Sequence, residues 1–234
     1  MIAFGVPILD EDLYLRCAAP SIATLAEPDS IVIHKRGYDS IQQPYNEILD
    51  EAAEHEDLEA VVLLHQDTWI DAPKLPQMIR WHFRDPTIGV IGAVGARGVD
   101  SMAWASGAAE PLGAVNIPVL SSARFVYSTG TQLADAVDGY LLIVSRRVAH
   151  TIRFDERGRA DFHGYDVDFC FRVRARGFRV IVEDLTTKHF SAGGDPTLAG
   201  YGRAYARWEQ TWNPARWPPE WRGSAPYGFF RPSG

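Results

Sequence analysis

Short apolar runs alternate with amphipathic segments along the first quarter of the chain. Ile2–Ile8 and Leu58–Leu64 are apolar almost throughout, as in strands covered on both faces, and Ser30–His34 is a third short strand candidate. Between these runs, Asp12–Leu25 has helical character, and Pro44–Glu56 carries apolar residues at the i, i+3, i+4, i+7 spacing of an amphipathic helix. This alternation predicts an α/β fold with a mixed, mainly parallel sheet covered by helices, of the Rossmann-like kind.

The second half of the chain is less regular. The segment 97–131 is loop-like and rich in Gly, Ser and Ala. The strands expected in this half are Thr87–Ala96, Val115–Leu120, Arg124–Tyr127, Ala136–Ser145 and Phe178–Val182, and the helices are Ser145–Thr151 and Tyr165–Arg176. We expect one domain over residues 1–195. Residues 196–234, rich in Trp and Pro, are expected to form an extension packed on that domain.

Composition narrows the class of protein. Of 234 residues, 46% are hydrophobic and 23% charged, which is ordinary for a globular chain. The net charge of -7 gives no basic footprint for nucleic acid. No apolar run reaches the roughly 18 residues of a membrane helix, and the N-terminus lacks the basic region of a secretory signal. Cys17 and Cys170 cannot make a disulfide framework. We therefore expect a cytoplasmic protein without an integral membrane segment, which would meet any lipid-linked acceptor at the membrane surface.

The first candidate site follows the strand Leu58–Leu64, which ends in His65, Gln66 and Asp67. In open α/β sheets, ligands bind at the carboxyl ends of strands. An imidazole and a carboxylate two residues apart on an extended backbone point to the same side, where they can hold Mn²⁺ or Mg²⁺ together with a diphosphate. The alternative is a histidine at a strand end, capped by an aspartate in the following turn.

The second candidate site lies later in the chain. Asp166 and Asp168 enter the helix expected at Tyr165–Arg176, where acids are favoured by the helix dipole. Helix capping alone can explain the presence of both acids, with no catalytic role. Alternatively, an aspartate held beside a cation could act as a general base. His189 follows the strand Phe178–Val182 after a short loop, and a structural role is the alternative for this residue too.

The order of these motifs resembles that of family-2-type glycosyltransferases of the GT-A fold, in particular the glycosyltransferase domain of streptomycin-biosynthesis proteins. The motifs are a helix with YN, a strand ending in HQD, a DGY strand, an FDE turn, a GYDVDFC helix and a KHFSAGG segment. The resemblance covers about residues 1–195 and is most specific over 137–194, where several motifs occur in the expected order and spacing.

The resemblance implies a metal-dependent, inverting transfer of a sugar from a nucleotide-sugar donor, such as a UDP- or GDP-sugar, to a hydroxyl of a carbohydrate or other acceptor. HQD stands at the place of the DxD motif. The implied metal ligands are His65, Asp67 and His189, the base that deprotonates the acceptor is Asp166, and the residues at the nucleotide or donor sugar are Pro7, Asn46, Gln66, Asp138 and Gly139. A base facing a cation gains from being ionised, so we expect Asp166 to be charged at neutral pH.

Two departures from the family pattern matter. His65 replaces the first acid of the DxD motif, which makes the metal site less anionic. The acidic motif expected after the second strand is replaced by HKRGYDS, where Asp39 is the candidate reader of the base. A catalytically silent GT-A-like domain that binds carbohydrate or a partner is therefore the alternative function. A nucleotidyltransferase is disfavoured, because the residues at the first strand, GVPILDED, are not a glycine-rich phosphate loop with a lysine.

Overall fold

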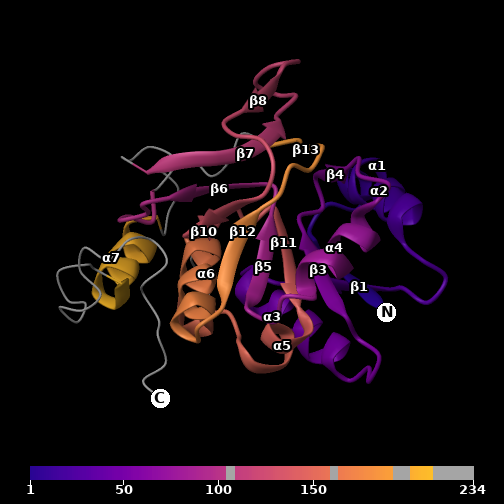
Figure 1. Cartoon of the computed structure of the whole chain (residues 1–234), viewed down its shortest axis with the longest axis horizontal. Helices are drawn as coiled ribbons and strands as arrows, with labels where there is room; N and C mark the ends of the chain where they lie inside the picture. Colours follow the sequence, from indigo (N-terminus) through magenta and orange to yellow (C-terminus); the bar gives the residue numbers. More distant parts are fainter. Residues whose placement is uncertain (104–108, 159–162, 192–200, 213–234) are drawn as a thin grey trace.

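The strands form two sheets in the structure, a computed structural model that describes residues 1–103, 109–158, 163–191 and 201–212. The first sheet has the strand order β2-β1-β3-β11-β5-β12-β9, and the second has the order β10-β6-β7-β13-β4, with β8 paired to β7. The second sheet lies at the top of the view in Figure 1, and helices cover the first. The expected α/β fold with a mixed sheet is confirmed.

The strands are β1 (Ile2–Ile8), β2 (Ile31–Arg36), β3 (Ala60–Leu64), β4 (Thr68–Ile70), β5 (Ile88–Gly92), β6 (Val94–Arg97), β7 (Glu110–Asn116), β8 (Arg124–Val126), β9 (Gln132–Ala134), β10 (Ala136–Val137), β11 (Leu141–Ser145), β12 (Arg179–Val182) and β13 (Thr187–His189). The α-helices are α1 (Glu11–Arg16), α2 (Ala18–Leu25), α3 (Gln42–Ala53), α4 (Leu75–Phe83), α5 (Arg146–Thr151), α6 (Tyr165–Ala175) and α7 (Tyr201–Trp212), and Glu156–Gly158 form a 3₁₀ turn.

Strand β3 shows why the first sheet is buried on both faces. All five of its residues are buried, and alternate side chains enter different cores. Val61 and Leu63 pack in the core that includes residues of α3, α5 and α6, whereas Val62 and Leu64 pack in the core that includes residues of α2 and α4. Each fully buried aliphatic side chain stabilises the fold by roughly 1.5–3 kcal/mol. Strand β3 is therefore firmly fixed in the sheet, and it fixes the position of the residues that follow it.

Parallel pairing is concentrated in the first half of the chain. β1 pairs in parallel with both β2 and β3, as the alternation of strands and helices predicts. β11 instead runs antiparallel to both β3 and β5, and most pairs of the second sheet are antiparallel. Parallel neighbours need a crossover of about a dozen residues, and several later connections are far shorter. This part of the fold is therefore more antiparallel than the sequence pattern indicates.

Three expected elements are divided in the structure. The helix expected at Asp12–Leu25 is split into α1 and α2 at Cys17, because Pro20 has no N–H to donate to the carbonyl four residues earlier. The strand expected at Thr87–Ala96 becomes β5 in the first sheet and β6 in the second. The strand expected at Ala136–Ser145 becomes β10 and β11, with a turn at 138–140 between them.

Helix α7 packs against α6 and lies to its left in Figure 1. Trp208 is 3% exposed, and the Trp212 indole N–H donates to Asp168 Oδ1 at 2.7 Å. Both indole rings meet Phe171 edge-on. The rest of the expected extension, residues 196–200 and 213–234, lies outside the described residues, and the domain boundary at 195 stays a prediction.

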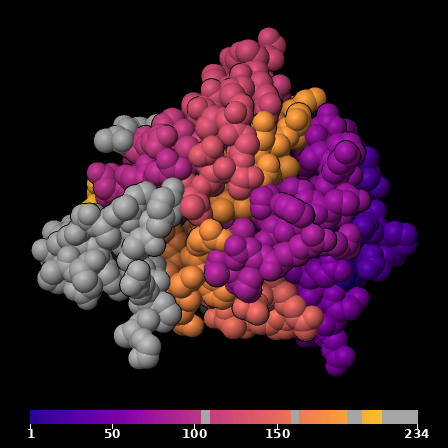
Figure 2. Space-filling view, viewed as in Figure 1, coloured from indigo at the N-terminus to yellow at the C-terminus, as the bar shows by residue number. Residues whose placement is uncertain are grey.

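Segments far apart in the sequence form one surface. Figure 2 shows α6 and β12–β13, in orange, directly against segments of the first hundred residues, in purple and magenta. Among the described residues, no helix combines the length and the apolar character that crossing a bilayer requires.

Candidate active site

The strand topology brings three chain segments to one edge of the first sheet. β1 and β3 are parallel, so their carboxyl ends, with Pro7 and His65, lie at the same edge. β11 is antiparallel to β3, with Leu141 opposite Leu64, so the turn that precedes β11 lies at this edge as well. His189 pairs with Thr68 across β13 and β4 and therefore lies beside Asp67.

These segments border a cavity of about 800 Å³, which is large enough for a nucleotide-sized ligand. Seven of the nine site residues expected from the sequence line it, and these are Pro7, His65, Gln66, Asp67, Asp138, Asp166 and His189. Asp67, Asp166 and His189, which are widely separated in the sequence, thus meet at one cavity.

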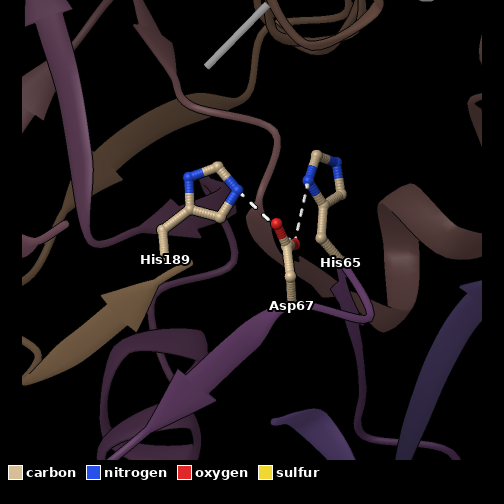
Figure 3. A group of neighbouring side chains, drawn as sticks. All are labelled: His65, Asp67 and His189. Carbon is tan, nitrogen blue, oxygen red and sulfur yellow. Dashed lines mark ion pairs between the residues drawn. The ribbon is translucent and has the colours of Figure 1, made fainter. Parts of the chain in front are cut away.

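His65, Asp67 and His189 form a compact cluster at this cavity (Figure 3). Asp67 Oδ1 lies 3.9 Å from His65 Nδ1 and 3.6 Å from His189 Nε2, and three potential ligand atoms lie within 4.8 Å of one another. The ring of Tyr140 stacks on His189 with 4.7 Å between centroids, and the hydroxyl of Ser191 lies 3.1 Å from His189 Nε2. Two imidazoles and one carboxylate therefore converge on one point.

The protonation states of His65 and Asp67 favour the binding of a cation. Burial, reinforced by the nearby His189, lowers the pKa of His65 to about 4, so its imidazole is neutral at neutral pH and keeps a nitrogen lone pair. Burial opposes ionisation of Asp67, but its interactions with His189 and His65 outweigh this, and the pKa of Asp67 lies below its ordinary value. A neutral imidazole and an ionised carboxylate are the protonation states that metal binding requires.

Asp138 and Asp166 form a second acidic pair at the cavity. Asp166 is the second residue of α6. Its Oδ2 accepts a hydrogen bond from the Gly139 N–H at 3.0 Å, while its Oδ1 accepts one from Val167 N–H at 2.9 Å. Burial and the charge of Asp138 raise the pKa of Asp166 to about 7. Burial also raises the pKa of Asp138. Without a cation, ionisation of Asp166 is therefore less favourable than for an ordinary carboxyl, and its ionisation beside a bound cation stays a prediction.

The raised pKa of Asp166 predicts a pH-dependent effect on stability. A carboxyl whose pKa is higher in the folded state favours folding while it is protonated, and this contribution is lost as the pH rises from about 4 to about 7. With a metal chelator present, Asp166→Asn should increase the free energy of unfolding at pH 8 by about 2 kcal/mol relative to wild type, with little difference at pH 4. Urea unfolding at both pH values measures this, and an equal difference at both would contradict it.

Gln66 and Gly139, two of the residues expected at the nucleotide or donor sugar, make hydrogen bonds that join neighbouring segments. Gln66 Oε1 accepts hydrogen bonds from Leu9 N–H at 2.7 Å and Asp10 N–H at 2.9 Å, which ties the HQD turn to the end of β1. Gly139 does not line the cavity itself, but its N–H orients Asp166. A side chain at Gly139 would place Cβ 2.2 Å from the Tyr165 hydroxyl, so only glycine fits there.

Asn46, like Gly139, is an expected site residue that does not line the cavity. Its amide nitrogen donates to the Phe154 carbonyl and to Glu156 Oε1, and its amide oxygen accepts from Phe154 N–H. Asn46 is 6% exposed, so these bonds clamp α3 to the segment after α5. The geometry supports a structural role, whereas contact with a nucleotide stays a prediction.

Replacing Asn46 tests this structural role. Asn46→Ala leaves the buried N–H and C=O of Phe154 without their amide partner, so we expect a loss of about 2–4 kcal/mol in the free energy of unfolding. The affinity for a nucleoside diphosphate should change little at a temperature where the variant is folded. Chemical unfolding and calorimetric titration measure the two effects, and a large loss of affinity in a stable variant would favour nucleotide contact instead.

The structure also reveals cavity residues that sequence reasoning did not select. Tyr165 lines the cavity, and its hydroxyl oxygen lies 2.6 Å from His65 Nε2. The sequence shows that Tyr165 directly precedes Asp166, but it does not show that the Tyr165 side chain points toward His65. Lys35, Tyr38 and Ser40 line the cavity together with Asp39, the candidate reader of the base.

Comparison with known proteins agrees with this architecture. A family model described as glycosyltransferase-like matches residues 3–195. The chain is also 30% identical over 213 residues to the streptomycin biosynthesis protein StrF of Streptomyces griseus, with 90% of this chain and 74% of that protein covered.

Solved structures share the fold. GalNAc-T7 in a crystal with UDP, GalNAc and Mn²⁺ superposes with a TM-score of 0.59 at 12% identity, covering 90% of this chain and 48% of that one, so this chain spans about half its length. A197 from STIV gives a TM-score of 0.53 at 14% identity, covering 81% of this chain and 85% of that one. At such identities the likeness shows the fold alone. Because the family model matches most of the chain and StrF is 30% identical over nine-tenths of it, this chain belongs to the glycosyltransferase-like family, of the family-2 type, and has the GT-A fold that its motifs indicate.

Proposed function

We propose that this protein is a metal-dependent, inverting glycosyltransferase that moves a sugar from a nucleoside-diphosphate sugar to an acceptor hydroxyl. The observation that carries the proposal is that the cluster of His65, Asp67 and His189 and the acidic side chain of Asp166 share one cavity. The three-residue cluster suits a cation with its diphosphate, and Asp166 suits proton transfer.

The side chains of the cluster fit a divalent cation. They offer two imidazole nitrogens and a carboxylate oxygen, and imidazole and carboxylate ligands together suit Mn²⁺ and similar ions. A cation bound there would neutralise charge on the leaving nucleoside diphosphate. That GalNAc-T7 was crystallised with UDP and Mn²⁺ supports the same assignment for this chain.

Asp166 is the proposed general base. Its pKa of about 7 lies near neutral pH, where a general base combines a useful ionised fraction with a strong affinity for the proton. The N–H groups of Gly139 and Val167 hold its two oxygens in place. Asp166 takes the proton of the acceptor hydroxyl as that oxygen bonds to the anomeric carbon. The bond from this carbon to the diphosphate oxygen breaks on the opposite face, which inverts the anomeric centre.

The nucleoside is proposed to bind at the part of the cavity bordered by Pro7, Tyr38 and Asp39. A carboxylate there can accept hydrogen bonds from the N–H groups of a base, and an aromatic ring offers a stacking surface. The donor is accordingly a UDP- or GDP-sugar, and the acceptor is a carbohydrate or another hydroxyl compound.

Calorimetric titration with UDP and GDP, each with and without Mn²⁺, tests this function. We expect binding of one nucleotide that depends on Mn²⁺, followed by slow hydrolysis of the matching nucleotide sugar when no acceptor is present. Absence of binding with Mn²⁺ at millimolar nucleotide would contradict the proposal. Binding without any hydrolysis or transfer, over a panel of sugars and acceptors, would favour the silent GT-A-like domain.

A further inference from the structure

Tyr165 connects the two halves of the proposed active site. It is the first residue of α6, directly before Asp166, and its hydroxyl oxygen lies 2.6 Å from His65 Nε2. The other ring nitrogen of His65, Nδ1, lies on the side of Asp67, 3.9 Å from its Oδ1. One nitrogen of His65 is therefore engaged by Tyr165, while the other faces the cluster of potential metal ligands.

Packing holds the Tyr165 hydroxyl in this position independently of His65. Tyr165 is 7% exposed, and its ring lies 6.0 Å from that of Tyr45 and 6.2 Å from that of Phe154, between centroids. Gly139 leaves the space that the hydroxyl occupies. Gly164, the N-cap residue directly before α6, has a φ of 72°, a left-handed conformation that glycine adopts without strain. The side chain of Tyr165 is thus a rigid partner for the imidazole.

The protonation of His65 decides which of its nitrogens can bind a cation. A neutral imidazole carries one proton, and the nitrogen that bears it cannot be a metal ligand. Coordination through Nδ1 requires the proton on Nε2. In that tautomer the Nε2–H donates a hydrogen bond to the Tyr165 oxygen at the observed separation.

We propose that Tyr165 is a positioning residue for the metal site, which holds His65 in the tautomer and orientation that present Nδ1 to the cation. This inference rests on the proposed function, since it requires that the cluster binds a metal ion. It assigns to Tyr165 a role that is exerted through His65 and involves no contact with the cation or with the sugar.

The proposal predicts an effect of Tyr165→Phe that differs between the metal-bound and metal-free states. In the metal-bound state of the variant, the His65 proton must stay on Nε2, although phenylalanine offers no oxygen to accept its hydrogen bond. In the metal-free state the proton can move to Nδ1, on the side of Asp67. The variant therefore loses more free energy with metal than without it, and we expect its affinity for Mn²⁺ to fall by about tenfold to a hundredfold.

The experiment measures Mn²⁺ binding to the full chain through the EPR signal of the free ion, for wild type and Tyr165→Phe. Tyr140→Phe is the matched control. Tyr140 is also buried and stacks on the other imidazole, His189, but its hydroxyl is paired with Thr187 Oγ1 at 2.9 Å. We expect Tyr140→Phe to bind Mn²⁺ like wild type, and thermal melting identifies a temperature at which all variants are folded.

A second pair of variants separates a role through His65 from a merely structural one. In the His65→Ala background, Tyr165→Phe should change the remaining Mn²⁺ affinity by no more than about twofold, because the imidazole that it positions is gone. An equal loss in both backgrounds, or no loss in the wild-type background, would overturn the inference. Failure of wild type to bind Mn²⁺ would instead refute the proposed function, so the two failures are distinguishable.

Discussion

Asp166→Asn is expected to lower the rate of sugar transfer by about a hundredfold to ten-thousandfold, the usual contribution of a general base. Asparagine keeps the size of the side chain but cannot take a proton from the acceptor hydroxyl. The amide oxygen can still accept a hydrogen bond from Gly139 or Val167, so the start of α6 should keep its geometry. Steady-state kinetics should therefore show a loss in kcat, with the donor KM and Mn²⁺-dependent nucleotide binding close to wild type.

Asp168→Asn is the matched control for this variant. Asp168 lies on the same helix, two residues later, and it bonds to Arg172 and to the Trp212 indole instead of lining the main cavity. Its replacement should lower stability and leave kcat within a few-fold of wild type. A comparable loss of kcat in both variants, or transfer that survives Asp166→Asn, would remove Asp166 from the role of base.

Asp67→Ala is expected to abolish the Mn²⁺-dependent part of nucleoside-diphosphate binding. Asp67 contributes the only carboxylate of the three-residue cluster and lies between the two histidines (Figure 3). Without it, two imidazoles remain, and the cluster loses its one anionic ligand. We expect the affinity for nucleotide in the presence of Mn²⁺ to fall by at least about a hundredfold, since loss of even an outer-shell partner costs ten- to a hundredfold in metal affinity.

Asp71→Ala provides the comparison for Asp67→Ala. Asp71 is an exposed aspartate just after β4, and its described hydrogen bond uses the backbone N–H, which alanine retains. This variant should bind Mn²⁺ and nucleotide like wild type in calorimetric titrations. If Asp67→Ala retained Mn²⁺-dependent binding while folded, the cluster of His65, Asp67 and His189 could not be the metal site.

The fold was predictable where local pattern and tertiary environment agree. β3 is a continuous apolar run because both of its faces are buried, and α3 is amphipathic because it covers one core. By contrast, the pattern of the apolar run 87–96 did not show that it contains two strands in different sheets. Both β5 and β6 are largely buried, so no change of hydrophobicity marks the point at which the chain leaves one sheet for the other.

The glycines of that run are explained only by the folded chain. A Cβ on Gly92 would lie 2.5 Å from Val137 Cβ, and one on Gly95 would lie 2.3 Å from the Ala136 carbonyl oxygen. These glycines therefore permit β10 to cross close to β5 and β6. A sequence shows that a glycine is present, whereas the backbone that approaches it lies about forty residues away and becomes its neighbour only on folding.

For the active site, the residue types were predictable and most of their contacts were not. HQD at the end of β3 and GYDVD at the start of α6 were identifiable because strand ends and helix starts are local features. Asn46 was assigned to the nucleotide from its motif, but its amide bonds to the backbone of a segment over one hundred positions later. The hydrogen bond of Tyr165 to His65 likewise joins residues one hundred positions apart.

By itself, the sequence determined the alternation of strands and helices, the absence of a long apolar run, and the identity of the acids and histidines proposed to carry the chemistry. The tertiary structure alone decided that Asp67 and His189 are neighbours, because that depends on β13 pairing with β4. It also decided that the pKa of Asp166 is raised, because burial and the approach of Asp138 disfavour its ionised form. Hydrophobic periodicity is set by each residue's immediate neighbours along the chain, whereas distances between side chains and the removal of water depend on which distant segments pack together.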